Sequence, residues 1–279
     1  MWCIQYELEV KVQSLFDGAA ACIAERDAAE KARLSRETAA RWRAGALGLM
    51  QDAPPASIGE PGRPAQPVLV APRELPQRKL SGLEGRAALI HAIAHIEFNA
   101  INLAWDAVYR FRGMPPRFYD DWVRVADEEA YHFCLLRTRL HELGYDYGGF
   151  KAHDGLWETA LDTAHDVLVR MALVPRVLEA RGLDVTPGIM ARLRAAGDEE
   201  TVALLEIILR DEIGHVEIGS RWFRWVCAQR GIAPEATFQT LIGQYLKGRI
   251  KGPFHREARL QAGFSEQELA LLAALDKSA

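Results

Sequence analysis

Two of the eight histidines in this sequence follow a glutamate at a spacing of three residues, in Glu129-Ala-Tyr-His132 and Glu212-Ile-Gly-His215. In a helix, residues three apart lie on one face, so each pair can bind the same metal ion. One such pair alone also arises by coincidence, or on a helix face that is open to water. The residues around the two pairs decide between these interpretations.

Both glutamates share their helix face with apolar residues. These neighbours are Trp122, Val125, Ala126, Phe133 and Leu136 around Glu129, and Leu205, Ile208, Leu209, Val216 and Gly219 around Glu212. Both glutamates therefore point toward the core. A carboxylate there costs on the order of several kcal/mol unless it is protonated, paired or bound to a cation. The interpretation as a solvated face fails for both.

Two more glutamates lie on apolar helix faces. Glu97 is flanked by residues such as Ile93 and Ile101, and Glu179 by residues such as Ala172 and Leu183, although Arg176 interrupts the second pattern. Glu97 precedes Glu129 by 32 residues, and Glu179 precedes Glu212 by 33 residues. Each half of the chain therefore supplies a glutamate and then, one antiparallel helix later, a Glu-x-x-His pair.

Together the two halves place four carboxylates and two imidazoles inside one bundle. The predicted ligands are Glu97, Glu129, His132, Glu179, Glu212 and His215. This is the ligand set of the dimetal carboxylate proteins built on four-helix bundles. Carboxylates mixed with imidazole, without thiolate, suit iron or manganese better than structural zinc. The sequence predicts about two iron or manganese ions as cofactor.

Two acidic residues and two histidines near these ligands allow alternative roles. Glu128 and Asp211 each precede a ligand glutamate by one residue, and they either orient an imidazole N–H or remain solvated. His91 and His95 share a stripe of their helix that diverges from the face of Glu97. We interpret these two histidines as packing or surface residues rather than ligands.

Long helical patterns must position these side chains. Apolar periodicity and stop signals predict four helices, over residues 83–112, 116–143, from residue 156 with a kink at Pro175, and 198–230. The predicted fold is all-α, a ferritin-like antiparallel four-helix bundle over residues 82–231. Residues 1–50 predict two extra N-terminal helices, with apolar positions at Leu8, Val12, Leu15 and Phe16. Residues 51–81 form a connector that holds seven of the 13 prolines within 51–77, and residues 232–279 form a C-terminal helical segment.

The composition is that of an ordinary water-soluble globular protein. The 279 residues are 49% hydrophobic and 26% charged, and a net charge of −4 gives no general attraction to nucleic acid or anionic membranes. Four scattered cysteines without a Cys-x-x-Cys pair indicate reduced thiols in a cytoplasmic protein. The N-terminus lacks the pattern of a signal peptide, and no apolar run is long enough to span a membrane.

Several stretches resemble a known family. HAIAHIEFNAINLAWDAVYRF, DEEAYHF, VPRVLEARGLDVTPG and RDEIGHVEIGSRWF resemble an uncharacterised ferritin-like family catalogued as domain of unknown function 455, and the resemblance covers most of the chain. More distantly, the Leu-Glu-Ala-Arg around Glu179 and the two Glu-x-x-His helices are similar to the non-haem diiron hydroxylase that modifies a tRNA adenosine side chain. This resemblance implies a diiron or manganese–iron oxidase or oxygenase with the six ligands named above. It implies no particular substrate.

We therefore expect an enzyme that activates O₂ and oxidises a small-molecule or tRNA-borne substrate. A ferroxidase or iron-storage protein without an organic substrate is the alternative, and a helical scaffold with a structural metal is a third interpretation. The segments outside the bundle favour an enzyme, because a minimal storage subunit needs only the bundle. No membrane partner is expected, and the oligomeric state is left open between a monomer and a homodimer.

A basic segment, KGRIKGPFHREAR, lies near the C-terminus. It contains Lys247, Arg249, Lys251, Arg256 and Arg259 and a single acidic residue. It is either a solvated basic patch or a loop that flanks the site entrance and holds an anionic substrate.

Overall fold

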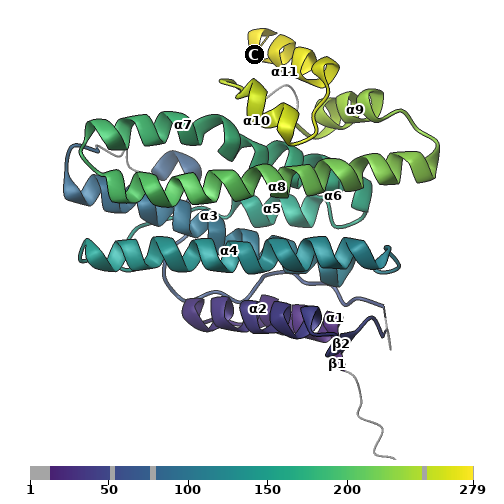
Figure 1. Ribbon diagram of the computed structural model, residues 1–279, viewed down its shortest axis with the longest axis horizontal. Helices are drawn as coiled ribbons and strands as arrows, with labels where there is room; N and C mark the ends of the chain where they lie inside the picture. The colour runs from purple at the N-terminus through teal and green to yellow at the C-terminus, as the bar shows by residue number, and fades with distance from the viewer. Residues whose placement is uncertain (1–12, 51–53, 76–79, 247–249, 279) are drawn as a thin grey trace, which may run out of the picture.

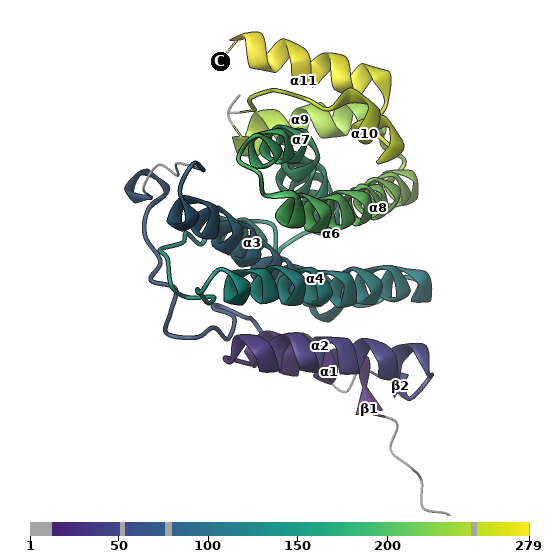
Figure 2. The ribbon, with the colours of Figure 1, turned by 60° about the vertical axis from the view of Figure 1, so that its left-hand side comes forward.

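The computed structural model describes residues 13–50, 54–75, 80–246 and 250–278, and nearly all of its regular structure is helical. The helices form successive layers, as Figure 1 and Figure 2 show. α1 and α2 pack on one side of α3 and α4, while α8 and the elements before it, α6, η2 and α7, lie on the other side. α9, α10 and α11 cover the side of α6, η2, α7 and α8 that faces away from α3 and α4. The all-α helical bundle predicted from the sequence is confirmed.

Four long rods form the centre of the molecule. They are α3 (Leu83–Arg110), α4 (Pro116–Glu142), a composite rod of α6 (Val167–Leu173), η2 (Val174–Glu179) and α7 (Ala180–Ala195), and α8 (Glu199–Arg230). A short turn with Gly113 at a φ of 77° joins α3 to α4, and a proline occupies the first position of α4. This short connection makes the two helices antiparallel neighbours.

α8 begins and ends where the sequence predicts. The side chain of Asp198 accepts a hydrogen bond from the backbone N–H of Thr201, and two glutamates occupy the first turn, near the positive end of the helix dipole. At the other end, Gly231 adopts a left-handed conformation with a φ of 64° that favours glycine. These caps fix the extent of the helix that carries Glu212 and His215.

The third rod differs from the continuous helix predicted from residue 156. The chain first forms α5 (Gly155–Asp162), turns, and begins α6 after Asp166, whose side chain caps the N–H of Leu168. The disturbance expected at Pro175 takes the form of a π-helical segment, η2. Proline lacks an N–H and its ring collides with the carbonyl of the preceding turn, and a widened π turn relieves both conflicts.

The two N-terminal helices cover α3 and α4. They are α1 (Leu15–Ala24) and α2 (Ala28–Arg43), flanked by the short parallel strands β1 (Gln13–Ser14) and β2 (Leu47–Gly48), which the sequence did not predict. Buried Lys31 on α2 donates to Asn102 on α3 at 2.8 Å, and the indole of Trp105 donates to Ser35 at 2.5 Å. Leu8 and Val12, for which helical spacing was predicted, lie outside the described residues.

The connector and the C-terminal segment both pack against the rods. The described part of the connector includes the 3₁₀ turn η1 (Pro72–Glu74), and Val68 and Val70 form backbone hydrogen bonds with Ala152. The C-terminal segment consists of α9 (Pro234–Leu246), α10 (Arg256–Gln261) and α11 (Glu266–Ser278). Arg176 on η2 joins this segment to the rods, because its guanidinium forms a buried ion pair of 2.6 Å with Glu268 on α11.

Within the described part of the chain, α3 alone has the length and apolar composition of a membrane span. The other helices bury 83% of its most apolar window. Such burial is the property of a core helix.

Candidate metal centre

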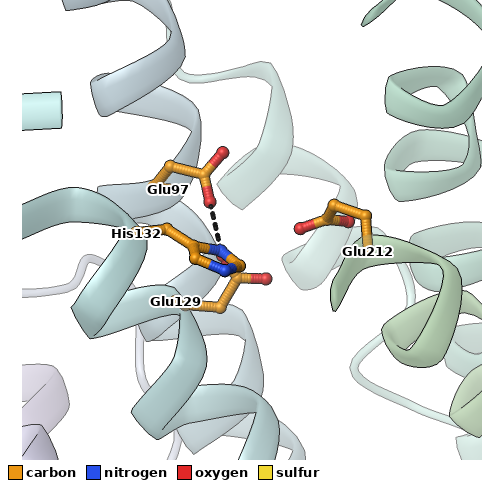
Figure 3. A group of neighbouring side chains, drawn as sticks. All are labelled: Glu97, Glu129, His132 and Glu212. Atoms are coloured by element: carbon orange, nitrogen blue, oxygen red, sulfur yellow. Dashed lines mark hydrogen bonds and ion pairs between the residues drawn. The ribbon is translucent and has the colours of Figure 1, made fainter. Parts of the chain in front are cut away.

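Four of the predicted ligands meet between α3, α4 and α8 (Figure 3). Glu97 projects from α3, Glu129 and His132 from α4, and Glu212 from α8. One potential ligand atom from each of these side chains lies within 4.8 Å of the corresponding atoms of the other three, and Glu97, Glu129 and His132 are almost fully buried. A single cation between these atoms can contact all four residues.

The other two predicted ligands border this group. Nδ1 of the buried His215 lies 3.0 Å from Oε1 of Glu129 and 3.3 Å from Oε1 of Glu212. Glu179 ends η2, and its carboxyl group interacts electrostatically with Glu212, Glu129 and His215. His215 therefore lies beside the four-residue cluster, and Glu179 contributes a further carboxylate from the third rod.

Two carboxylates of the site have buried oxygens without a hydrogen bond from the described residues, whereas Glu97 and Glu212 each contact an imidazole nitrogen at 3.3 Å. Both oxygens of Glu129 are buried near imidazole nitrogens, at 3.0 Å from His215 and 3.7 Å from His132, but neither contact is aligned as a hydrogen bond. Oε2 of Glu179 is likewise buried without a hydrogen-bond partner among the described residues. Such oxygens need a cation or a proton, so this donor set fits hard metal ions.

The electrostatics of the carboxyl groups follow from their crowding. Burial raises the pKa of Glu97 well above its usual value, and the nearby negative charge of Glu129 raises it further. Burial and Glu212 raise the pKa of Glu179, and burial and Glu129 raise the pKa of Glu212. Three carboxyl groups thus hold protons more tightly than usual, and a bound cation would offset both their burial and their mutual repulsion.

The two imidazoles respond in the opposite sense. Burial by itself lowers a histidine pKa, but the contacts with Glu129 and Glu97 raise the pKa of His132 to about 11. Glu212 and Glu129 raise the pKa of His215 well above its usual value. Although burial opposes ionisation of Glu129, His215 and His132 hold its pKa below the usual value. The site therefore attracts positive charge, and metal binding must displace protons from both histidines.

The far side of each imidazole contacts a carboxylate from the opposite helix. Nε2 of His132 on α4 lies 3.2 Å from Oδ2 of Asp211 on α8, and Nε2 of His215 on α8 lies 2.8 Å from Oε2 of Glu128 on α4. Nε2–H therefore donates to the carboxylate, and Nδ1 faces the cluster and is left to bind a metal. Glu128 and Asp211 do orient imidazoles, but each acts on the histidine of the other helix.

A close contact between two rods fixes the position of η2. Pro175 packs directly on Gly219 of α8, where a Cβ atom added to the glycine would lie 2.2 Å from Cγ of Pro175. Gly219 comes one helical turn after His215, and Pro175 one turn before Glu179. The absence of a side chain at Gly219 thus allows η2 to approach α8 and present Glu179 to the cluster.

His91 and His95 hold a loop rather than the cluster. His91 accepts a hydrogen bond from the N–H of Gly148, and Nε2 of His95 lies 3.1 Å from the carbonyl oxygen of His153. Nδ1 of His95 lies 2.8 Å from the hydroxyl of Tyr147. This agrees with their interpretation as packing residues. In the sequence, the aromatic residues Tyr147 and Phe150 of the loop after α4 are the signal that could have indicated the packing of this loop on His91 and His95.

The fold and the cluster define an all-helical protein with a buried carboxylate–histidine site able to hold a metal ion. The family described as "Protein of unknown function (DUF455)" matches residues 24–270, and this chain belongs to that family. The chain is 50% identical over 213 residues to an uncharacterized protein of Haemophilus influenzae, an alignment that covers 74% of each protein. No solved structure matches the chain.

Proposed function

We propose that this protein is a non-haem dimetal carboxylate enzyme that activates O₂ and oxidises or hydroxylates an organic substrate. The observation that supports this proposal is the buried meeting of four carboxylates and two imidazoles, in which neither oxygen of Glu129 has a hydrogen bond from the described residues. A structural hydrogen-bond network satisfies its buried acceptors, whereas this cluster leaves them for cations.

The six ligands have distinct positions in this proposal. Glu129 lies between the two imidazoles. Glu97 and His132 would hold one ion, Glu212 and His215 would hold the other, and Glu129 would contribute to both. Glu179 adds the fourth carboxylate. Two iron ions, or a manganese–iron pair, supply the electrons for O₂ activation when bound.

The residues around the ligands keep water away and hold the ligands in place. Phe98 and Phe133 follow Glu97 and His132 in the sequence, are buried, and contact each other with ring centroids 5.7 Å apart. They pack against Tyr147 in the loop after α4. The burial of Glu97, Glu129 and His132 is what would keep water from the site. Asp211 and Glu128 fix the ring orientation and the tautomer of the two histidines through the contacts described above.

Metal content tests the ligand assignment. The double substitution Glu129→Ala and Glu212→Ala is expected to abolish iron and manganese binding, measured by elemental analysis, while circular dichroism shows unchanged helix content. The matched control is Glu142→Ala with Glu217→Ala, which removes the same charges from the surfaces of α4 and α8. Full metal occupancy in the first variant contradicts the assignment.

Oxygen consumption separates the enzyme from an iron-storage protein. Adding O₂ to the ferrous protein is expected to consume O₂ and to give a transient visible absorption, with slow turnover in the absence of substrate. Rapid oxidation of many iron ions per chain, with mineral deposition, favours the ferroxidase alternative instead.

A further inference from the structure

A cavity that the carboxylates of the candidate metal centre do not line lies between the composite rod and the C-terminal segment. It has a volume of about 330 Å³ and is lined on one side by Val177 and Leu178 of η2. Ile250, Phe254 and other apolar residues of the C-terminal segment form much of the opposite wall. The size and the apolar lining are those of a small-molecule site.

The charged residues of this cavity are mostly cationic. Arg176, Arg181, Lys251 and Arg259 line it, and Asp184 is the acidic residue of the lining. Both oxygens of Asp184 are already engaged by Arg259, at 2.9 Å and 2.7 Å, so this carboxylate neutralises that guanidinium. Arg176 is neutralised in the same way by Glu268.

Two cations of the lining keep a surplus of positive charge. Arg181 donates to the carbonyl oxygens of Lys251, Gly252 and Pro253, contacts that position the guanidinium without neutralising its charge. Its nearest carboxylate oxygen, on Asp184, lies 3.8 Å away and is already bound to Arg259. Lys251 is exposed and forms no ion pair with the described residues.

Two buried donors of the neutralised arginines remain without an acceptor. Nη1 of Arg176 and Nη1 of Arg259 are buried and have no hydrogen-bond acceptor in the described part of the chain. A charged donor without an acceptor is costly, and an anion close by lowers that cost. The basic segment KGRIKGPFHREAR therefore contributes Lys251 and Arg259 to this cavity. Its Arg256 pairs with Glu266 and does not line the cavity, and Lys247 and Arg249 lie outside the described residues.

We propose that this cavity binds a small organic anion, a carboxylate or phosphate group attached to an apolar body. The apolar walls bind the body, and Arg181 and Lys251 bind the head group. An inorganic anion leaves the apolar walls without a partner, and a neutral apolar molecule leaves the two cations without one. None of the six predicted metal ligands lines this cavity, so either proposal can fail without the other.

Calorimetric titration of the full chain with matched probes tests this site. Octanoate and octyl phosphate carry the anion and the apolar body, octanol lacks the charge, and acetate lacks the apolar body. At low salt, at least one of the two anionic amphiphiles is expected to bind at least tenfold more tightly than octanol and acetate, and the tighter of the two identifies the head group. Binding is expected to weaken as salt is added. Equal affinity for octanoate, octyl phosphate and octanol overturns the proposal, as does the absence of binding by both anions.

Substitutions at Lys251 locate the binding. Lys251→Gln is expected to weaken binding of the preferred anion by about two- to fivefold, the range for a partly exposed ion pair, and Lys251→Glu by more. Octanol binding and metal content are expected to stay unchanged in both variants. Arg256→Gln is the control, because it removes a charge from the same segment outside the cavity. If Arg256→Gln weakens anion binding as much as Lys251→Gln does, the effect is one of general charge and the assignment of the site is wrong.

Discussion

Replacing Gly219 with alanine tests how η2 is positioned. In the present structure the added carbon would lie 2.2 Å from Cγ and 2.3 Å from Cβ of Pro175, whereas carbon atoms in good contact are about 3.5–4.0 Å apart. Both residues are buried, and the ring of Pro175 is rigid, so α8 and η2 must move apart by on the order of 1 Å. Overpacking of this kind costs about 1–3 kcal/mol, offset by the gain of about 0.5–1 kcal/mol from replacing a helical glycine.

The net expectation for Gly219→Ala is a loss of about 1–2 kcal/mol in the free energy of unfolding of the metal-free protein. At about 2–4 °C per kcal/mol for chains approaching this size, the melting temperature falls by about 2–8 °C. Because Pro175 and Glu179 share η2, metal affinity is also expected to fall, by about tenfold. Urea unfolding in the presence of a chelator and metal titration measure the two effects separately.

Gly182→Ala is the matched control. Gly182 lies in α7, one turn after Glu179, and a side-chain carbon there meets no atom within 4 Å. This variant is expected to gain about 0.5–1 kcal/mol and to keep its metal affinity. If Gly219→Ala instead gains stability as Gly182→Ala does, the close packing of Pro175 on α8 does not constrain η2, and the reasoning is refuted.

Two further predictions concern titratable groups. Burial and Glu129 raise the pKa of Glu97, so a neutral side chain is favoured at this position in the metal-free protein. Glu97→Gln should then leave the stability of the metal-free protein level or higher, while the stabilisation by metal, about 2.7 kcal/mol at a hundredfold excess over Kd, shrinks in thermal unfolding. A clear loss of stability in the metal-free variant would place Glu97 in a structural network. Burial lowers the pKa of His95 to about 4, so the folded state binds fewer protons than the unfolded state between pH 4 and about 6.5. Stability contributed by neutral His95 is present above pH 6.5 and is lost as the pH falls to 4, by up to about 3 kcal/mol, and His95→Gln should lack this part of the pH dependence in urea unfolding. Parallel losses in the two proteins would show that His95 is not held neutral.

The four residues of the buried cluster and most helix ends could be predicted from the sequence because they depend on local patterns. A glutamate and a histidine three residues apart share a face of any helix, and apolar flanks reveal that the face is buried. Asp198 and Gly231 act as caps within a few residues of their positions, so both ends of α8 were predictable. The iron or manganese identity and the reaction with O₂ remain predictions, since the same donor atoms accept several hard cations.

The tertiary structure decided how the two halves of the bundle meet. The sequence indicates that Glu128 and Asp211 lie near the ligands, but their contacts with His215 and His132 depend on the rotation and height of α4 against α8. The break between α5 and α6 was not predicted from the sequence, and the π turn at Val174–Glu179 accompanies a close fit of Pro175 against Gly219, a residue 44 positions later. The cavity of Arg181 and Lys251 exists only because the C-terminal segment folds back over η2. Helical periodicity states which face of a helix is apolar, whereas close packing between helices distant in sequence selects the depth and register at which those faces meet.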